Sequence, residues 1–176
     1  MASESTLTEI NSVHPALKIV KDLVYDRAGI SLSNLKIGKE SVEYGACSFE
    51  LNGKLIQHRV SKITPMKAGQ FVTIWKRSED GVTEPFDDTD DIDFIIITVR
   101  MDSNIGQFIL PKSLLIEKGI ITSNGKNGKR GIRVYPPWDT VTNKQATKTQ
   151  SWQRKYFLEV GNDASLDLDW LRQLFR

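Results

Sequence analysis

The spacing of apolar residues divides the chain into helices near its two ends and a run of strands between them. Apolar residues at three- and four-residue intervals, followed by Gly29, predict a first helix over 14–27. Alternating apolar and polar residues predict strands at 42–51, 54–63, 71–75, 93–100, 108–110 and 132–135. Helical spacing returns at 111–119, 145–158 and 166–175. This order of elements indicates an α+β fold with a mostly antiparallel sheet flanked by helices.

Three segments place these strands relative to one another. The Asn52–Gly53 pair is typical of a tight turn, so the strands on either side of it should form a hairpin. Strand 93–100 is apolar on both faces, which predicts a central position in the sheet. Residues 78–90 are polar and acidic, which predicts a loop.

The length and composition fit one soluble globular domain. The chain has 176 residues, 39% hydrophobic and 26% charged, so we expect a single domain over 1–176 with 1–11 as a flexible N-terminal tail. Cys47 has no second cysteine to pair with, as expected in a reducing cytosol. The N-terminus lacks the basic start and apolar core of a signal peptide, and no apolar run is long enough to span a bilayer. We therefore predict a cytoplasmic monomer without membrane insertion.

Charges of opposite sign are segregated along the middle of the chain. Residues 59–77 carry five cationic side chains and no acidic one, whereas 79–93 carry eight acidic side chains and no basic one. Residues 112–155 then hold ten lysines and arginines against two acidic residues. An ordinary solvated surface mixes its signs. The segregation therefore predicts a basic face that meets an anion, with an acidic loop beside it.

Aromatic residues and glutamines are interspersed with these cations. Lysine and arginine can contact phosphates, aromatic rings can stack on bases, and glutamine amides can read base edges. The candidate residues for binding nucleic acid or another anion are Arg59, Lys62, Lys67, Gln70, Trp75, Lys76, Arg77, Gln107, Lys112, Lys129, Arg130, Arg133, Tyr135, Trp138, Gln150 and Trp152. Tryptophans in a domain of this size are also often core residues, and a Gly/Lys-rich loop such as 125–131 is also often plain surface.

A metal-dependent nuclease is one alternative, but its expected motif is missing. Nucleases of the restriction-endonuclease type use an acidic residue and an acidic-x-Lys tripeptide to hold a divalent cation and to position water. The sequence contains no Asp/Glu-x-Lys tripeptide. The catalytic candidates that remain are Glu40, Asp91, Asp93 and Lys62, and a solvated loop end is the preferred explanation of the two aspartates. We therefore expect no cofactor, and a divalent metal ion only if this alternative holds.

Other chemistries find less support in the sequence. His14 and His58 have no partner at metal-ligand spacing, so we predict no metal site. Cys47 stands in an apolar strand, which favours a buried small residue over a nucleophile. Neither of the glycine-rich nucleotide-binding motifs is present.

Several long segments resemble the MepB family. They are KITPMKAGQFVTIWKR at 62–77, EPF at 84–86, DD at 90–91, GQF at 106–108, PK at 111–112, RVYP at 133–136, Trp138, TQSWQ at 149–153 and YF at 156–157. The family is named for a bacterial multidrug-efflux operon, in which it accompanies a transporter and a repressor, and its own activity is not established. The resemblance implies a core like that of restriction endonucleases, as an analogy of fold.

These observations together predict a MepB-like protein that binds DNA or RNA in a basic groove on a nuclease-like scaffold. The basic residues of 59–77 and 129–133 are expected to share one face with Lys112. One alternative is the divergent nuclease or phosphodiesterase described above. The other is a module that binds an acidic small molecule or a protein partner.

Overall fold

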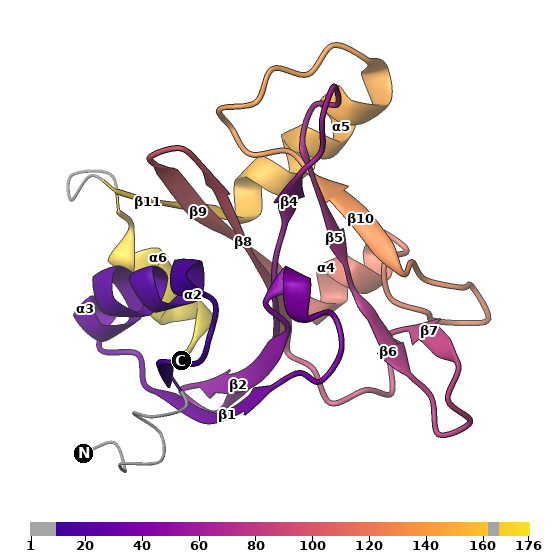
Figure 1. The fold of residues 1–176 in the computed structure, drawn as a ribbon, viewed down its shortest axis with the longest axis horizontal. Helices are drawn as coiled ribbons and strands as arrows, with labels where there is room; N and C mark the ends of the chain where they lie inside the picture. Colours follow the sequence, from indigo (N-terminus) through magenta and orange to yellow (C-terminus); the bar gives the residue numbers. More distant parts are fainter. Residues whose placement is uncertain (1–9, 162–165) are drawn as a thin grey trace.

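The centre of the molecule is a six-stranded sheet (Figure 1). The computed structural model describes residues 10–161 and 166–176. The strands lie in the order β1 (Leu32–Ile37), β2 (Cys47–Leu51), β3 (Lys54–Val60), β8 (Phe94–Met101), β9 (Asn104–Pro111) and β11 (Phe157–Val160). Neighbours are antiparallel except β3 and β8, which run parallel. The predicted single α+β domain with a mostly antiparallel sheet is confirmed, and β8 has the predicted central position.

Helices from both ends of the chain cover one face of this sheet (Figure 1). They are α2 (Pro15–Val20), the π-helical turn η1 (Lys21–Tyr25), α3 (Asp26–Ala28) and α6 (Leu168–Leu174). The first three follow one another without a break, so the predicted helix 14–27 is confirmed with one wide turn inside it. The layer packs Leu17 and Phe175 against Phe49 and Ile96 of the sheet in one hydrophobic core.

A second, smaller sheet and two helices cover the opposite face. These elements are β4 (Lys62–Ile63), β5 (Gln70–Thr73), β10 (Gly131–Val134), α4 (Lys112–Glu117) and α5 (Lys144–Gln153). β5 lies between β10 and β4 and is antiparallel to both. Val72, Val134 and Leu115 pack with Ile97 and Phe108 of the large sheet in a second core. The large sheet is therefore the middle layer of three.

A two-stranded hairpin and two short turns complete the fold. The hairpin pairs β6 (Trp75–Arg77) with β7 (Thr83–Pro85), and β7 lies inside the segment 78–90 that was predicted as a loop. The turns are the 3-10 segments η2 (Val42–Tyr44) and η3 (Arg154–Tyr156).

Two predicted strands have different boundaries in the structure. Strand 42–51 begins late, because η2 forms between Ser41 and Gly45, which both adopt left-handed backbone angles. Strand 54–63 divides at Ser61. The Ser61 N–H still donates to the Thr98 carbonyl at 3.0 Å, but the chain then leaves the large sheet and pairs β4 with β5.

Other boundaries are set by pairing between distant segments. β1 was not predicted, and β9 extends well beyond the predicted 108–110 because it pairs with β8 along its whole length. The predicted helix 145–158 ends at Gln153, since Phe157 begins β11 and pairs with Phe108. Most of the predicted tail lies outside the described residues, but Ile10 is buried in the first core. Among the described helices, none has the length and apolar content to cross a membrane.

Candidate nucleic-acid interface

Two adjoining hollows lie where α5 meets the small sheet and α4. The first, of about 390 Å³, lies between β10 and α5, and the second, of about 540 Å³, lies along α5. Lys118 and Trp152 line both hollows, so the two form one continuous surface. We call this the basic surface; its cations are Lys118, Lys129, Arg133, Lys144, Lys148 and Lys155. Among the residues that the structure describes, no carboxylate lines either hollow.

Most of these cations are free to meet a ligand. Among the residues that the structure describes, no carboxylate lies within ion-pair distance of Lys129, Lys144, Lys148 or Lys155. The Lys118 ammonium lies 3.5 Å from Glu117 and 5.3 Å from the centre of the Trp152 ring. Trp152 is only partly buried against the second core and exposes part of its ring to both hollows.

The outward face of the small sheet extends the basic surface. In the antiparallel register Arg133 pairs with Phe71, and Phe71 pairs with Lys62, so the three side chains form a row on one face. The neighbouring residues Val72 and Val134 point the other way, into the second core. The row therefore places an aromatic ring between two cations.

The aromatic rings on this face lie over glycines. A Cβ at Gly131 would lie 2.6 Å from the Phe71 ring, and a Cβ at Gly69 would lie 2.7 Å from the Tyr135 ring. Any larger residue would displace the rings, so glycine is required at both positions. Tyr44 meets Phe71 edge-on, with the ring centres 6.3 Å apart. The result is an aromatic and cationic sheet face in front of α5.

Two glutamines fasten α5 to β10 and to the segment that follows it. β10 is an edge strand, and its outward backbone groups need partners. Gln153 supplies them: its Oε1 accepts from the Tyr135 N–H at 2.8 Å and its Nε2 donates to the Arg133 carbonyl at 3.0 Å. Gln150 donates to the Pro136 and Asp139 carbonyls. We call these contacts of Gln150 and Gln153 the glutamine clasp. Gln150 cannot read bases as predicted, because its amide is buried in the clasp.

The structure brings together five of the thirteen cations and aromatics predicted as ligand contacts. Those on or beside the basic surface are Lys62, Lys129, Arg133, Tyr135 and Trp152. The exposed Lys67 belongs to the turn before β5, and Arg133 holds this turn through the Ala68 carbonyl and the Thr64 hydroxyl.

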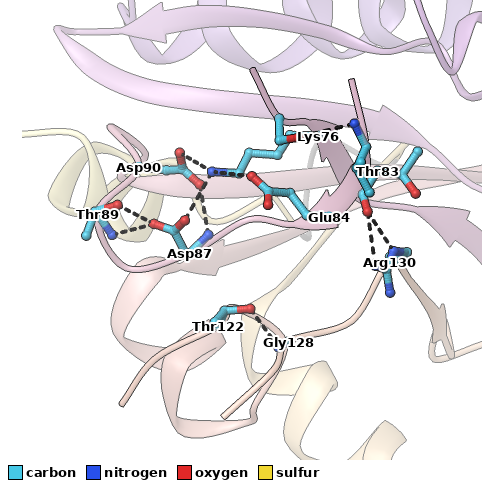
Figure 2. A network of polar contacts seen from close by, with 11 residues as sticks. Lys76, Thr83, Glu84, Asp87, Thr89, Asp90, Thr122, Gly128 and Arg130 are labelled. Atoms are coloured by element: carbon cyan, nitrogen blue, oxygen red, sulfur yellow. Dashed lines mark hydrogen bonds and ion pairs between the residues drawn. The ribbon is translucent and has the colours of Figure 1, made fainter. Parts of the chain in front are cut away.

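A second group of predicted cations is neutralised inside the protein. Figure 2 shows the Lys76 ammonium among three carboxylates, at 2.8 Å from Asp90, 3.1 Å from Asp87 and 3.5 Å from Glu84. Partial burial lowers the pKa of Lys76, but the hydrogen bonds that its ammonium donates to Asp90 and Asp87 outweigh this effect and raise the pKa above its ordinary value. Hydrogen bonds from Thr89 and Lys76 in turn lower the pKa of Asp87 to about 2. The acidic loop therefore binds its own cation.

The other cations near this loop are also engaged. Lys112 donates to the Asp90 carbonyl at 2.6 Å. Figure 2 shows Arg130, which donates twice to the Thr83 carbonyl. Arg77 forms an ion pair with Glu40 at 2.5 Å. The basic residues of 59–77 and 129–133 were expected to share one binding face with Lys112. The cations of this group do not serve as that face, because acidic partners and carbonyls inside the protein already bind them.

The remaining predicted residues are mostly structural. Gln70 is buried and bonds Ser61 and the Arg100 carbonyl, and Gln107 is fully buried and bonds Tyr25 and Thr98. Neither amide reaches the surface, so neither can read a base. Trp138 packs edge-on against Phe157 in the second core, and Trp75 lies under the Arg77 guanidinium. Arg59 is buried in another hollow.

Two of the four candidate catalytic residues, Lys62 and Asp93, lie well apart in the fold, and Asp91 is exposed just before β8. Glu40 is paired with Arg77, whereas Asp93 accepts from the Leu55 N–H at 2.8 Å at the start of β8. Lys62 directly follows Ser61, whose N–H donates to the Thr98 carbonyl. Thr98 is five residues farther along the chain than Asp93, so the two are about 16 Å apart along β8. Within the described residues no three His, Cys, Asp or Glu side chains are grouped so that they could hold a metal ion.

Sequence reasoning missed the lysines on α5. Lys144, Lys148, Trp152 and Lys155 follow one another at intervals of four, four and three residues. Residues at these intervals lie on one face of a helix, so the pattern could have been found before the structure was known. Phe71 was also missed, because its strand gave no indication of which face is buried.

Comparisons with known proteins agree on one family. The model of the family described as MepB-like matches residues 38–159. A solved structure described as "Crystal Structure of MepB" is 35% identical to this chain, with a TM-score of 0.74. The match covers 85% of this chain and 99% of that chain. No curated protein sequence matches significantly.

Proposed function

The chain belongs to the MepB-like family, and we propose that it binds single-stranded nucleic acid on the basic surface. One observation carries the proposal: within the described part of the chain, two adjoining hollows are lined by six cations and no carboxylate, with Trp152 between them. A phosphate backbone is a polymer of negative charge, so a continuous row of cations suits it better than it suits a single small anion.

The aromatic residues favour single strands over a duplex. Bases in a duplex are stacked on one another, whereas unpaired bases can stack on exposed rings. Trp152, Tyr135 and Phe71 are partly exposed beside the cations, and Phe71 and Tyr135 lie over Gly131 and Gly69 on an open sheet face. Cations that contact phosphates, with rings that contact bases, form the combination found in single-strand binders.

The proposal is binding without efficient cleavage. Glu40 is paired with Arg77, no three His, Cys, Asp or Glu side chains among the described residues are grouped to hold a metal ion, and the sequence has no acidic-x-Lys tripeptide. Two carboxylates are the usual minimum for holding magnesium against water. The cytoplasmic location and the monomeric state predicted from the sequence are compatible with this function and stay predictions.

Fluorescence anisotropy with labelled 15-nucleotide RNA and DNA, single- and double-stranded, tests the proposal. We expect single strands to bind more tightly than duplexes, with an affinity that falls steeply as salt rises. If all six cations contact phosphates, the slope of log K against log salt is about −4.

Variants of the basic surface test its location. Lys148→Ala/Lys155→Ala should reduce the slope by about 1.4, because two phosphate contacts are lost. Trp152→Leu should weaken binding fivefold or more through lost stacking. The matched control, Lys18→Ala/Lys54→Ala, removes two lysines outside the basic surface and should leave binding unchanged. An affinity independent of salt, or an equal loss in the control, would refute the proposal.

A further inference from the structure

Arg59 is a buried cation whose hydrogen bonds are incomplete. It lies on β3 with only 7% of its surface exposed. Nη1 donates to the His58 carbonyl at 2.8 Å, but the buried Nε has no partner. No carboxylate in the described part of the chain lies within ion-pair distance of its guanidinium. The other arginines discussed above, Arg77, Arg130 and Arg133, each use their Nε as a donor.

The side chain lines a hollow of about 290 Å³ between the large sheet and β6. Because neighbouring residues of a strand point to opposite faces, Arg59 lies on the face away from His58 and the helical layer. Lys36 and Lys39 stand on the wall of the hollow, together with the neutral polar side chains of Ser48 and Gln57. This hollow shares no lining residue with the basic surface.

The side chains that line this hollow carry an excess of positive charge. Its lining includes one carboxylate, Glu40, which is already paired with Arg77. Lys76 also lines the hollow, but its charge is balanced by the acidic loop. Arg59, Lys36 and Lys39 remain without acidic partners among the described residues. A buried unsatisfied donor on a charged group is costly and rare in native proteins, so it indicates that something else completes its bonds.

We propose that this hollow is a second binding site, which takes a small organic phosphate. A phosphate monoester carries nearly two negative charges and three acceptor oxygens, enough for a guanidinium, two ammonium groups and nearby neutral donors. A carboxylate offers fewer charges and fewer acceptors. Trp75 and Phe86 on the same lining provide an apolar wall for the organic part of the ligand. The volume lies at the lower end of the range for small-molecule sites, so the ligand is small.

The site is independent of nucleic-acid binding on the basic surface. The two predictions use different residues, and the failure of one leaves the other in place. Saturation of this hollow with a mononucleotide should therefore not displace a single-stranded oligonucleotide from α5.

Isothermal titration calorimetry of the full-length protein with adenosine monophosphate, inorganic phosphate and adenosine tests the proposal. We expect saturable binding of adenosine monophosphate, weaker binding of inorganic phosphate, and no binding of adenosine at the same concentrations. Arg59→Met keeps the length and apolar stem of the side chain but removes its charge and donors, and should weaken binding of adenosine monophosphate about tenfold or more.

Lys36→Ala and Lys39→Ala test the proposal even if the Arg59 variant does not fold. Both lysine side chains are exposed, so their removal should not disturb the fold. Each variant should weaken the binding of adenosine monophosphate severalfold while leaving the circular dichroism spectrum and the thermal midpoint unchanged. Lys18→Ala is the control for a simple loss of charge and should bind normally. The proposal fails if neither phosphate compound binds, if adenosine binds as tightly as its monophosphate, or if the Arg59, Lys36 and Lys39 variants all bind like the unmodified protein.

Discussion

The buried His58 should lower the stability of the protein in mild acid. Its ring is fully buried, with Nε2 at 2.8 Å from the Thr98 hydroxyl and Nδ1 at 3.6 Å from the Cys47 sulfur. Burial, followed by the charge of neighbouring Arg59, lowers the pKa of His58 from 6.5 to about 3. The Thr98 hydroxyl also accepts a hydrogen bond from the Gln107 amide. The His58 ring therefore cannot reach water without breaking this buried hydrogen-bond network.

The sign and size of the effect follow from this pKa. Between pH 6.5 and about 3 the unfolded chain binds a proton at His58, whereas the folded chain does not. The free energy of unfolding therefore falls as the pH is lowered through this window. At about 1.4 kcal/mol per pH unit, the contribution of His58 falls by about 3 kcal/mol between pH 7 and pH 4. A domain of this kind is stable by about 5–15 kcal/mol, so the loss is readily measured.

Urea denaturation at pH 7 and pH 4, with the unmodified protein and His58→Gln, isolates this contribution. Carboxylates also titrate in acid; Asp87, with its lowered pKa, contributes stability that is lost as pH falls from 3.8 toward about 2. They are common to both proteins and cancel in the comparison. We expect the pH-dependent loss to be about 3 kcal/mol smaller in the variant.

An equal loss in both proteins would refute the reasoning. If the variant does not fold, the His58 ring resonances of the unmodified protein give a second measurement. They should show a neutral ring down to pH 4, and titration near pH 6.5 would contradict the prediction.

Two further predictions concern the clasp and the thiol. Gln153→Leu should destabilise the fold by about 2–4 kcal/mol in urea denaturation, because it leaves the Tyr135 N–H and the Arg133 carbonyl without partners. The control is Gln145→Leu, at an exposed position on the same helix, which should change stability by less than about 0.5 kcal/mol. Burial raises the pKa of the Cys47 thiol from 9.0 to about 12. Ellman's reagent at neutral pH should therefore react about a thousandfold more slowly with the folded protein than with the unfolded one. Similar rates would contradict the buried position of the thiol.

The sequence predicts the strands that follow a regular local pattern and misses those that depend on distant partners. β8 could be recognised because its residues are apolar on both faces, and it is buried on both. β1 could not, since Leu35 is the one residue of that strand classed as buried and there is no alternation to detect. The end of α5 could not be placed either. The chain leaves the helix to pair Phe157 with Phe108, and helical spacing contains no information about that partner.

The glutamines show a similar limit within the site. Gln70, Gln107 and Gln150 have side chains suited to reading bases, and all three are buried with their amides bonded inside the protein. Amide chemistry alone does not distinguish the two roles, because both need the same donors and acceptors. The distinction is made by strand register and by packing, which bring Tyr25 within 2.6 Å of Gln107 across 82 residues of sequence.

The cations of the chain fall into two classes that the sequence cannot separate, and the separation determines the function proposed for this surface. Lys76 and Lys148 are both lysines in charged segments. Lys76 meets Asp90, 14 residues away, because β6 and the acidic loop fold against each other. Lys148 lies on a helix face where no carboxylate of the described residues is at ion-pair distance. A paired ammonium would have to break existing bonds to bind a phosphate. An unpaired one already in water gains a contact and releases a counterion. Nucleic acid should therefore find its contacts on α5 and the small sheet, and the acidic loop should hold its own cations when the ligand binds.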